Sequence, residues 1–130
     1  MPERDSPVSV TLAEALSIVK RAMQAAAAED RATYTFLLWK SAAEAEYAAF
    51  QLSMAQGLSD FNPSSNHDEA DFEPTAEAAH ELLLYAQSCL QSKPRDAYFT
   101  IRKAVTILRK MSVAAENLSK GQRARLESRD

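Results

Sequence analysis

Apolar residues recur every three or four positions in four stretches of the chain, which is the period of an α-helix with one buried face. The expected helices cover residues 11–28, 34–55, 74–93 and 94–120. Their apolar seams are Leu12, Leu16, Ile18, Val19, Ala22, Met23 and Ala26; Leu38, Ala42, Ala45, Ala49 and Leu52; Ala76, Ala79, Leu83, Ala86 and Leu90; and Ala97, Ile101, Ala104, Leu108, Met111, Ala115 and Leu118. Four seams of comparable length predict an all-α four-helix bundle.

Local signals place the ends of these helices. A capping box, Thr11-Leu12-Ala13-Glu14, predicts the start of the first helix. The junction 29–33 holds neither Gly nor Pro, which leaves one continuous helix as an alternative, but the seam changes phase there and Asp30 can cap a new start, so we favour a tight turn. Gly57 suits a left-handed cap, Pro74 suits a first helical turn, and Gly121 is expected to end the last helix.

The segment 59–73 is polar and acidic and has no sustained period, which is typical of a long loop. We expect it to join two helical hairpins, with Phe61 and Phe72 anchoring its two ends. The expected organisation is a flexible arm at 1–8, a single domain at 9–120 and a flexible tail at 121–130. A chain of 130 residues is long enough for one such core.

The helix expected at 34–55 carries a second apolar stripe about 180° from its seam. A helix in a simple bundle needs only one such face, so the second requires another cover. One interpretation is that the loop, the arm or the flanking helices cover it. We favour the other, an interface with another protein and a homodimer or larger homo-oligomer, in which aromatic residues anchor the contact. The stripe consists of Phe36, Trp39, Ala43, Tyr47, Phe50 and Met54.

Charge is distributed unevenly behind a net value of −3. Residues 1–92 hold 5 Lys/Arg against 14 Asp/Glu, a net −9, and residues 93–130 hold 10 against 4, a net +6. Such a split suggests that the last helix faces something anionic, either the acidic part of the same protein or a partner. A basic strip on that helix, which is also compatible with a nucleic-acid backbone, consists of Arg95, Arg102, Lys103, Arg109 and Lys110.

Candidate chemistry is sparse. Glu77 and His80 have the Glu-x-x-His spacing of a bundle di-metal site, but His67 lies in the expected loop without a matching carboxylate, so we expect no metal and no cofactor. Cys89 is separated from His80 by roughly 13 Å of helix and half a rotation, which prevents a thiol–imidazole pair on that helix. We therefore expect no catalytic residues and no enzyme activity.

A lone cysteine, the absence of a signal-peptide pattern at the start and the lack of a long uncharged apolar run predict a cytoplasmic protein with no membrane partner. The sequence thus favours a small non-enzymatic protein–protein interaction module, acting as a regulator, adaptor or inhibitor. The alternative is a nucleic-acid-binding protein that uses the basic strip.

Overall fold

Four α-helices pack together in the computed structural model, which describes residues 6–57 and 74–127 and the side chains of the last helix as far as residue 118. The helices are α1 (Pro7–Ala27), α2 (Arg31–Gln56), α3 (Ala76–Cys89) and α4 (Pro94–Glu127). The predicted all-α four-helix bundle is confirmed. The segment 59–73, with Phe61 and Phe72, lies outside the described residues, as do most of the expected arm and the end of the expected tail.

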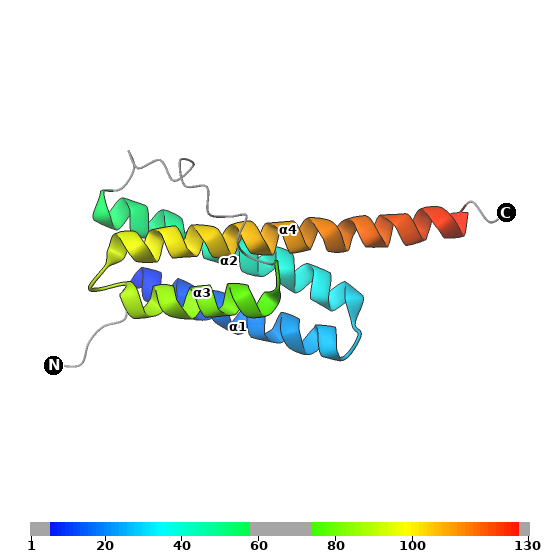
Figure 1. Cartoon of the computed structure of the whole chain (residues 1–130), viewed down its shortest axis with the longest axis horizontal. Helices are drawn as coiled ribbons and strands as arrows, with labels where there is room; N and C mark the ends of the chain where they lie inside the picture. The colour runs from blue at the N-terminus through cyan, green and yellow to red at the C-terminus, as the bar shows by residue number, and fades with distance from the viewer. Residues whose placement is uncertain (1–5, 58–73, 128–130) are drawn as a thin grey trace.

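Each helix packs mainly against two others. α1 contacts α2 and α3, and α4 contacts the same two helices, so that α2 and α3 occupy diagonal corners. Figure 1 shows that α1 and α4 run in one direction and that α2 and α3 run in the other. Neighbouring helices are therefore antiparallel throughout, and the two hairpins, α1–α2 and α3–α4, pack side by side. The C-terminal part of α4 continues past the ends of the other helices (Figure 1).

The core is built from the predicted seams. The largest fully buried apolar side chains come from all four helices and are Leu12, Ile18, Val19, Leu38, Leu83, Ile101 and Leu108. Burial fades towards the C-terminal ends of the seams of α1, α3 and α4, where Met23, Leu90 and Met111 are half-buried and Ala26 and Leu118 are exposed. The seams thus identify the core correctly, but they extend beyond the region where a second helix covers them.

The predicted capping box of α1 is wrong. The helix begins at Pro7, and the Ser6 side chain accepts a hydrogen bond from the Ser9 N–H at 3.1 Å. The Thr11 hydroxyl lies inside the helix and donates to the Pro7 carbonyl at 2.9 Å. Pro7 explains the earlier start, because its fixed φ and missing N–H suit the first helical position. Val8, assigned to a flexible arm, is consequently part of the core.

The turn between α1 and α2 confirms that the two helices are separate. Glu29 adopts a left-handed φ of 60°, and the N–H groups of Glu29 and Asp30 donate to the carbonyls of Ala26 and Ala25 at 3.1 and 2.9 Å. These two bonds form a Schellman motif in which a glutamate occupies the usual glycine position. Asp30 then caps α2 through the Thr33 N–H at 3.2 Å.

The other helix ends follow the sequence signals in part. Gly57 ends α2 with a φ of 66°, as expected. Thr75, rather than the turn at Pro74, caps α3, and its side chain accepts from the Ala78 N–H at 3.1 Å. The expected end of α4 is wrong, since the helix passes through Gly121 and continues to Glu127. One glycine costs a helix only about 1 kcal/mol relative to alanine, and the neighbouring Lys, Arg and Leu residues favour helix.

Alanine substitutions in the α4 seam should lower the free energy of unfolding at core positions but not at surface positions. Leu108 is completely buried, whereas Leu118 on the same helix is 62% exposed. Leu108→Ala should lower the free energy of unfolding by roughly 2–5 kcal/mol, because it leaves a cavity. Leu118→Ala is the matched control and should change it by less than about 0.5 kcal/mol. Urea unfolding followed by circular dichroism measures both values, and equal losses would contradict the assigned core.

The Asp30 cap should give stability with a defined pH dependence. Hydrogen bonds from the Thr33 side chain and backbone N–H lower the pKa of Asp30 from its ordinary 3.8. The pKa of Asp30 is therefore lower in the folded protein than in the unfolded chain. The stability that the ionised Asp30 cap adds is complete above the unfolded-state pKa and is lost as the pH falls through the folded-state pKa. Asp30→Ala should lower the melting temperature at pH 7 but have less effect in acid. Asp30→Asn, which keeps a capping oxygen, should stay near wild type at pH 7.

Candidate protein-interaction surface

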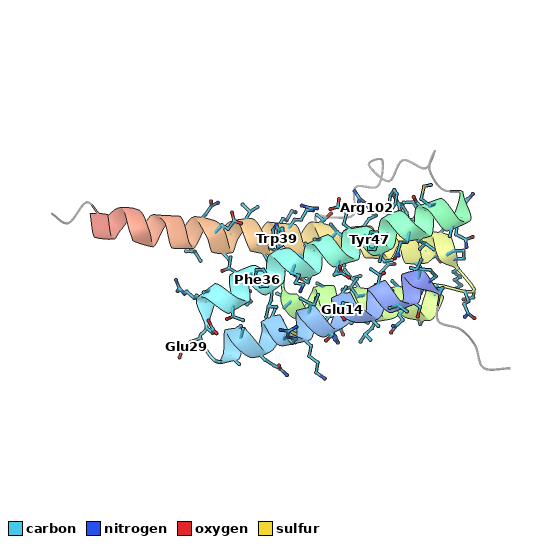
Figure 2. All side chains as sticks on the ribbon, turned by 180° about the vertical axis from the view of Figure 1, so that it is seen from behind. Glu14, Glu29, Phe36, Trp39, Tyr47 and Arg102 are labelled. Carbon is cyan, nitrogen blue, oxygen red and sulfur yellow. The ribbon has the colours of Figure 1, made fainter. Side chains whose placement is uncertain are left out.

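The second apolar stripe of α2 lies on the outside of the bundle. Its large side chains are all more than half exposed, at 54% for Phe36, 56% for Trp39, 52% for Tyr47, 58% for Phe50 and 63% for Met54. Ala43, in the middle of the stripe, is also exposed. Figure 2 shows Phe36, Trp39 and Tyr47 along one side of α2. We call this surface, from Phe36 to Met54, the α2 aromatic face.

The inward side of α2 explains why its large residues lie outside. It is formed mainly by small side chains, and Ser41, Ala42, Ala45, Ala48 and Ala49 are all at most 3% exposed. Small residues allow the α2 backbone to approach α1 and α4 closely, and large rings would not fit in the same space. The Ser41 hydroxyl donates to the Leu38 carbonyl at 2.9 Å, so this buried polar group is satisfied within the helix.

One end of the α2 aromatic face is locally ordered by contacts among its own side chains. The rings of Phe36 and Trp39 lie 6.2 Å apart between centroids and are tilted by 32°. The Lys40 Nζ atom lies 5.9 Å from the centroid of Phe36, within the range of a cation–π contact. Such contacts restrict the side chains before any partner binds, which reduces the conformational entropy lost in binding.

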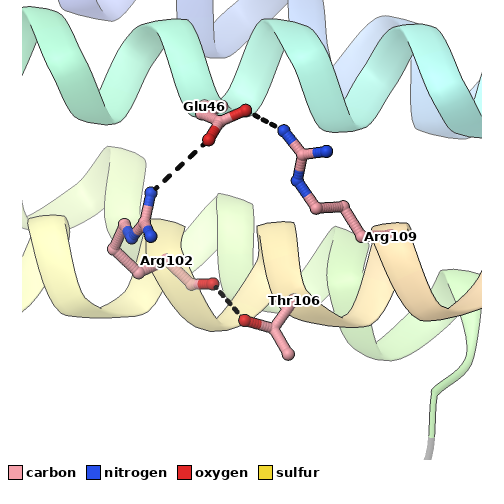
Figure 3. A network of polar contacts seen from close by, with 4 residues as sticks. All are labelled: Glu46, Arg102, Thr106 and Arg109. Carbon is pink, nitrogen blue, oxygen red and sulfur yellow. Dashed lines mark hydrogen bonds and ion pairs between the residues drawn. The ribbon is translucent and has the colours of Figure 1, made fainter. Parts of the chain in front are cut away.

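A cluster of charged side chains lies on the α4 side of α2. Glu46 of α2 pairs with two arginines of α4 that are one heptad apart: Arg109 donates a hydrogen bond to Glu46 Oε1, and Arg102 Nη1 lies 3.9 Å from Oε2 (Figure 3). The Arg102 carbonyl also accepts from the Thr106 hydroxyl at 3.1 Å, which is an ordinary helical contact. Within α2, Glu46 follows Ala43 by less than one turn, so this cluster is close to the aromatic face.

The basic strip of α4 is therefore partly used inside the protein. Arg102 and Arg109 meet an acidic residue of α2, as one of the two interpretations of the charge split proposed. Arg95 and Lys103 also take part in interactions, and Lys110 is exposed. Glu46 was not among the expected site residues. Periodicity could not identify it, because the rotation of α4 about its axis relative to α2 is set by packing.

The Glu46 cluster should contribute little to stability. Its three side chains are 40–53% exposed, and exposed ion pairs contribute about 0–1 kcal/mol each. The double variant Arg102→Gln with Arg109→Gln should keep a melting temperature within a few degrees of wild type. Ile101→Ala, which truncates the buried seam one residue before Arg102, is the contrast and should unfold much more readily. A large loss in the double variant would show that the cluster holds α2 and α4 together.

Of the residues considered for chemistry, Glu77, His80 and Cys89 are described, whereas His67 lies outside the described residues. Within the described ranges there is no group of three His, Cys, Asp or Glu side chains that could hold a metal ion. Glu77 is instead near Tyr34, whose pKa is raised by burial and by that carboxylate. Cys89 is buried, and a hydrogen bond with it raises the pKa of Tyr85. These contacts join neighbouring side chains without forming a nucleophile–base pair.

Among the hollows of the described part of the chain, one lies at each end of the bundle. One, of about 580 Å³, is between the α1–α2 turn and α4 and is bordered by Glu29, Tyr34 and Leu118. The other, of about 640 Å³, is bordered by Ser6, Leu52 and Gln87 together with neighbouring serines and glutamines. The first is lined by apolar side chains together with Glu29, Asp30 and Arg31, and the second mainly by serines and glutamines. Among the described lining residues neither hollow contains a His or Cys side chain, and neither displays a line of large exposed apolar side chains like the α2 aromatic face.

Comparison of the chain with protein-family models, with curated proteins and with solved structures finds no match. In the part of the chain that the structure describes, no helix is both long and apolar enough to cross a membrane.

Proposed function

We propose that this protein is a non-enzymatic interaction module that binds another protein through the α2 aromatic face. The observation that carries the proposal is the line of five large apolar side chains, each more than half exposed, along one helix. Contiguous apolar surface of this kind is uncommon on monomers and is typical of interfaces. Trp and Tyr, both present on this face, are the residues that most often dominate binding energy.

The size of the surface supports the same proposal. Half-exposed rings offer on the order of 100 Å² each, since a Phe, Tyr or Trp buries roughly 150–250 Å² when fully covered. Five such side chains and the residues beside them therefore allow a complex to bury about 1,000 Å² in total, the lower limit for a specific interface. The Glu46 cluster on one edge and Lys40 on the other give this apolar surface a polar rim.

Such a module acts by covering part of its partner, which is how regulators, adaptors and inhibitors work. A homo-oligomer is the form of association that we expect. The proposed setting is the cytoplasm, where the buried, unpaired thiol of Cys89 would stay reduced. Binding of nucleic acid by the basic strip is the alternative, and it has less support because Arg102 and Arg109 already pair with Glu46.

Association should depend on Trp39. At micromolar concentration the protein should sediment as a species heavier than the 14.4 kDa monomer. Trp39→Ala should weaken association by about 30-fold, the equivalent of a hot-spot loss of about 2 kcal/mol. Tyr85→Ala is the matched control, since Tyr85 is a half-exposed ring on α3, diagonal to α2.

Two outcomes would count against this function. One is binding of the protein to nucleic acid that is unaffected by Trp39→Ala and weakens steeply as the salt concentration rises, which would favour the basic strip as the binding surface. The other is a monomer whose co-purifying proteins are the same for wild type and Trp39→Ala, which would exclude the α2 aromatic face as a binding surface.

A further inference from the structure

The α2 aromatic face has a nearly symmetric order of residues about Ala43. Four residues before and after Ala43 are Trp39 and Tyr47, and seven residues before and after it are Phe36 and Phe50. At eleven residues on either side are exposed Ala32 and Met54. The face thus reads in nearly the same way from both ends, with a small residue at its centre.

We infer that this face binds a second copy of the chain, with the two α2 helices antiparallel and a two-fold axis at Ala43. This inference rests on the proposed function and names its partner. In such a pair, a residue n positions before Ala43 lies level with the residue n positions after Ala43 of the other copy. Phe36 then meets Phe50, Trp39 meets Tyr47, and Ala43 meets the same residue of the partner. A two-fold interface must be self-complementary in this way.

The shape of the face suits an antiparallel pair. Ala43 at the axis lets the two helices approach closely, and the aromatic pairs on either side fill the widening space. At both ends, Ala32 of one copy lies level with Met54 of the other, so the helix separation is equal at the two ends. A parallel pair would instead place Ala32 against itself and Met54 against itself, which leaves a gap at one end and crowding at the other.

Charges beside the face fit the same arrangement. Lys40 and Glu44 follow each other along one edge of the face, one turn apart. The same edges of the two helices adjoin in an antiparallel pair, so Lys40 of one copy lies about two residues, or 3 Å along the axis, from the level of Glu44 of the other. The two-fold axis produces this opposite-charge contact twice. On the other edge, Glu46 offsets one of the two positive charges of Arg102 and Arg109 within each copy.

Disulfide trapping tests this arrangement, with Cys89→Ala as the background because Cys89 is the only native cysteine. Ala43→Cys should give a disulfide-linked dimer under mild oxidation. Ala32→Cys and Met54→Cys should each remain unlinked when oxidised alone. In the antiparallel pair, Ala32 of one copy is level with Met54 of the other, so the two copies of Ala32 are about 33 Å apart, and so are the two copies of Met54. A mixture of these two proteins should give a linked heterodimer.

The outcomes separate the arrangement from the proposed function. Linkage of Ala32→Cys or Met54→Cys alone, without a gain in the mixture, would show a parallel pair and overturn the inference while α2 remained the interface. No linkage in samples that still sediment as dimers would place the homodimer interface elsewhere. No linkage in monomeric samples would exclude a second copy as the partner. The proposed function would then be tested by whether other proteins co-purify with wild type but not with Trp39→Ala.

A charge at the axis gives an independent test. Ala43→Glu brings two carboxylates together on the proposed two-fold axis and should weaken the dimer at least tenfold in sedimentation at pH 7. Ala114→Glu, a matched change at an exposed alanine of α4, should leave association unchanged. Circular dichroism should show the same helix content in both variants, since both sites are exposed. A dimer that tolerates Ala43→Glu would overturn the inference.

Discussion

The close packing of α2 between α1 and α4 is the constraint on which the rest of the structure depends. It requires small residues on the inward side, and Ser41, Ala42, Ala45, Ala48 and Ala49 provide them. Leu38 and Leu52 are the larger residues at the two ends of this side. Because small residues occupy most of the inward side of α2, its aromatic side chains lie outside. The exposed face is therefore a consequence of the way the core is filled.

The polar contacts follow from the same geometry. The packing of α2 against α4 places Glu46 between two arginines one heptad apart. The resulting cluster combines charge from the acidic and the basic parts of the chain. Because the cluster borders an apolar surface, it also limits the width of that surface. Specific interfaces have this combination of an apolar centre and a charged rim, whereas a hydrophobic surface without a rim favours aggregation.

Periodicity predicted the parts of the fold that depend on burial. The seams through Leu38, Leu83 and Leu108 were sufficient to define the bundle and to recognise that α2 has a second stripe. Helix ends were less predictable because competing caps differ by only about 1 kcal/mol, so that Ser6 rather than Thr11 caps α1 and Gly121 does not end α4. Glu46 could not be assigned to its cluster from sequence, since that requires the relative rotation of two packed helices.

The position of Trp39 has an optical consequence. It is the only tryptophan of the chain, and it lies on the exposed side of α2 instead of in the core. The described core contains no fully buried aromatic ring, since Tyr34 and Tyr98 are only partly covered. Indole emission of the unmodified protein therefore reports the environment of one surface, while the packing of the aliphatic interior is nearly silent in fluorescence. A molecule bound on the α2 aromatic face would therefore change the emission of this one indole without any added label.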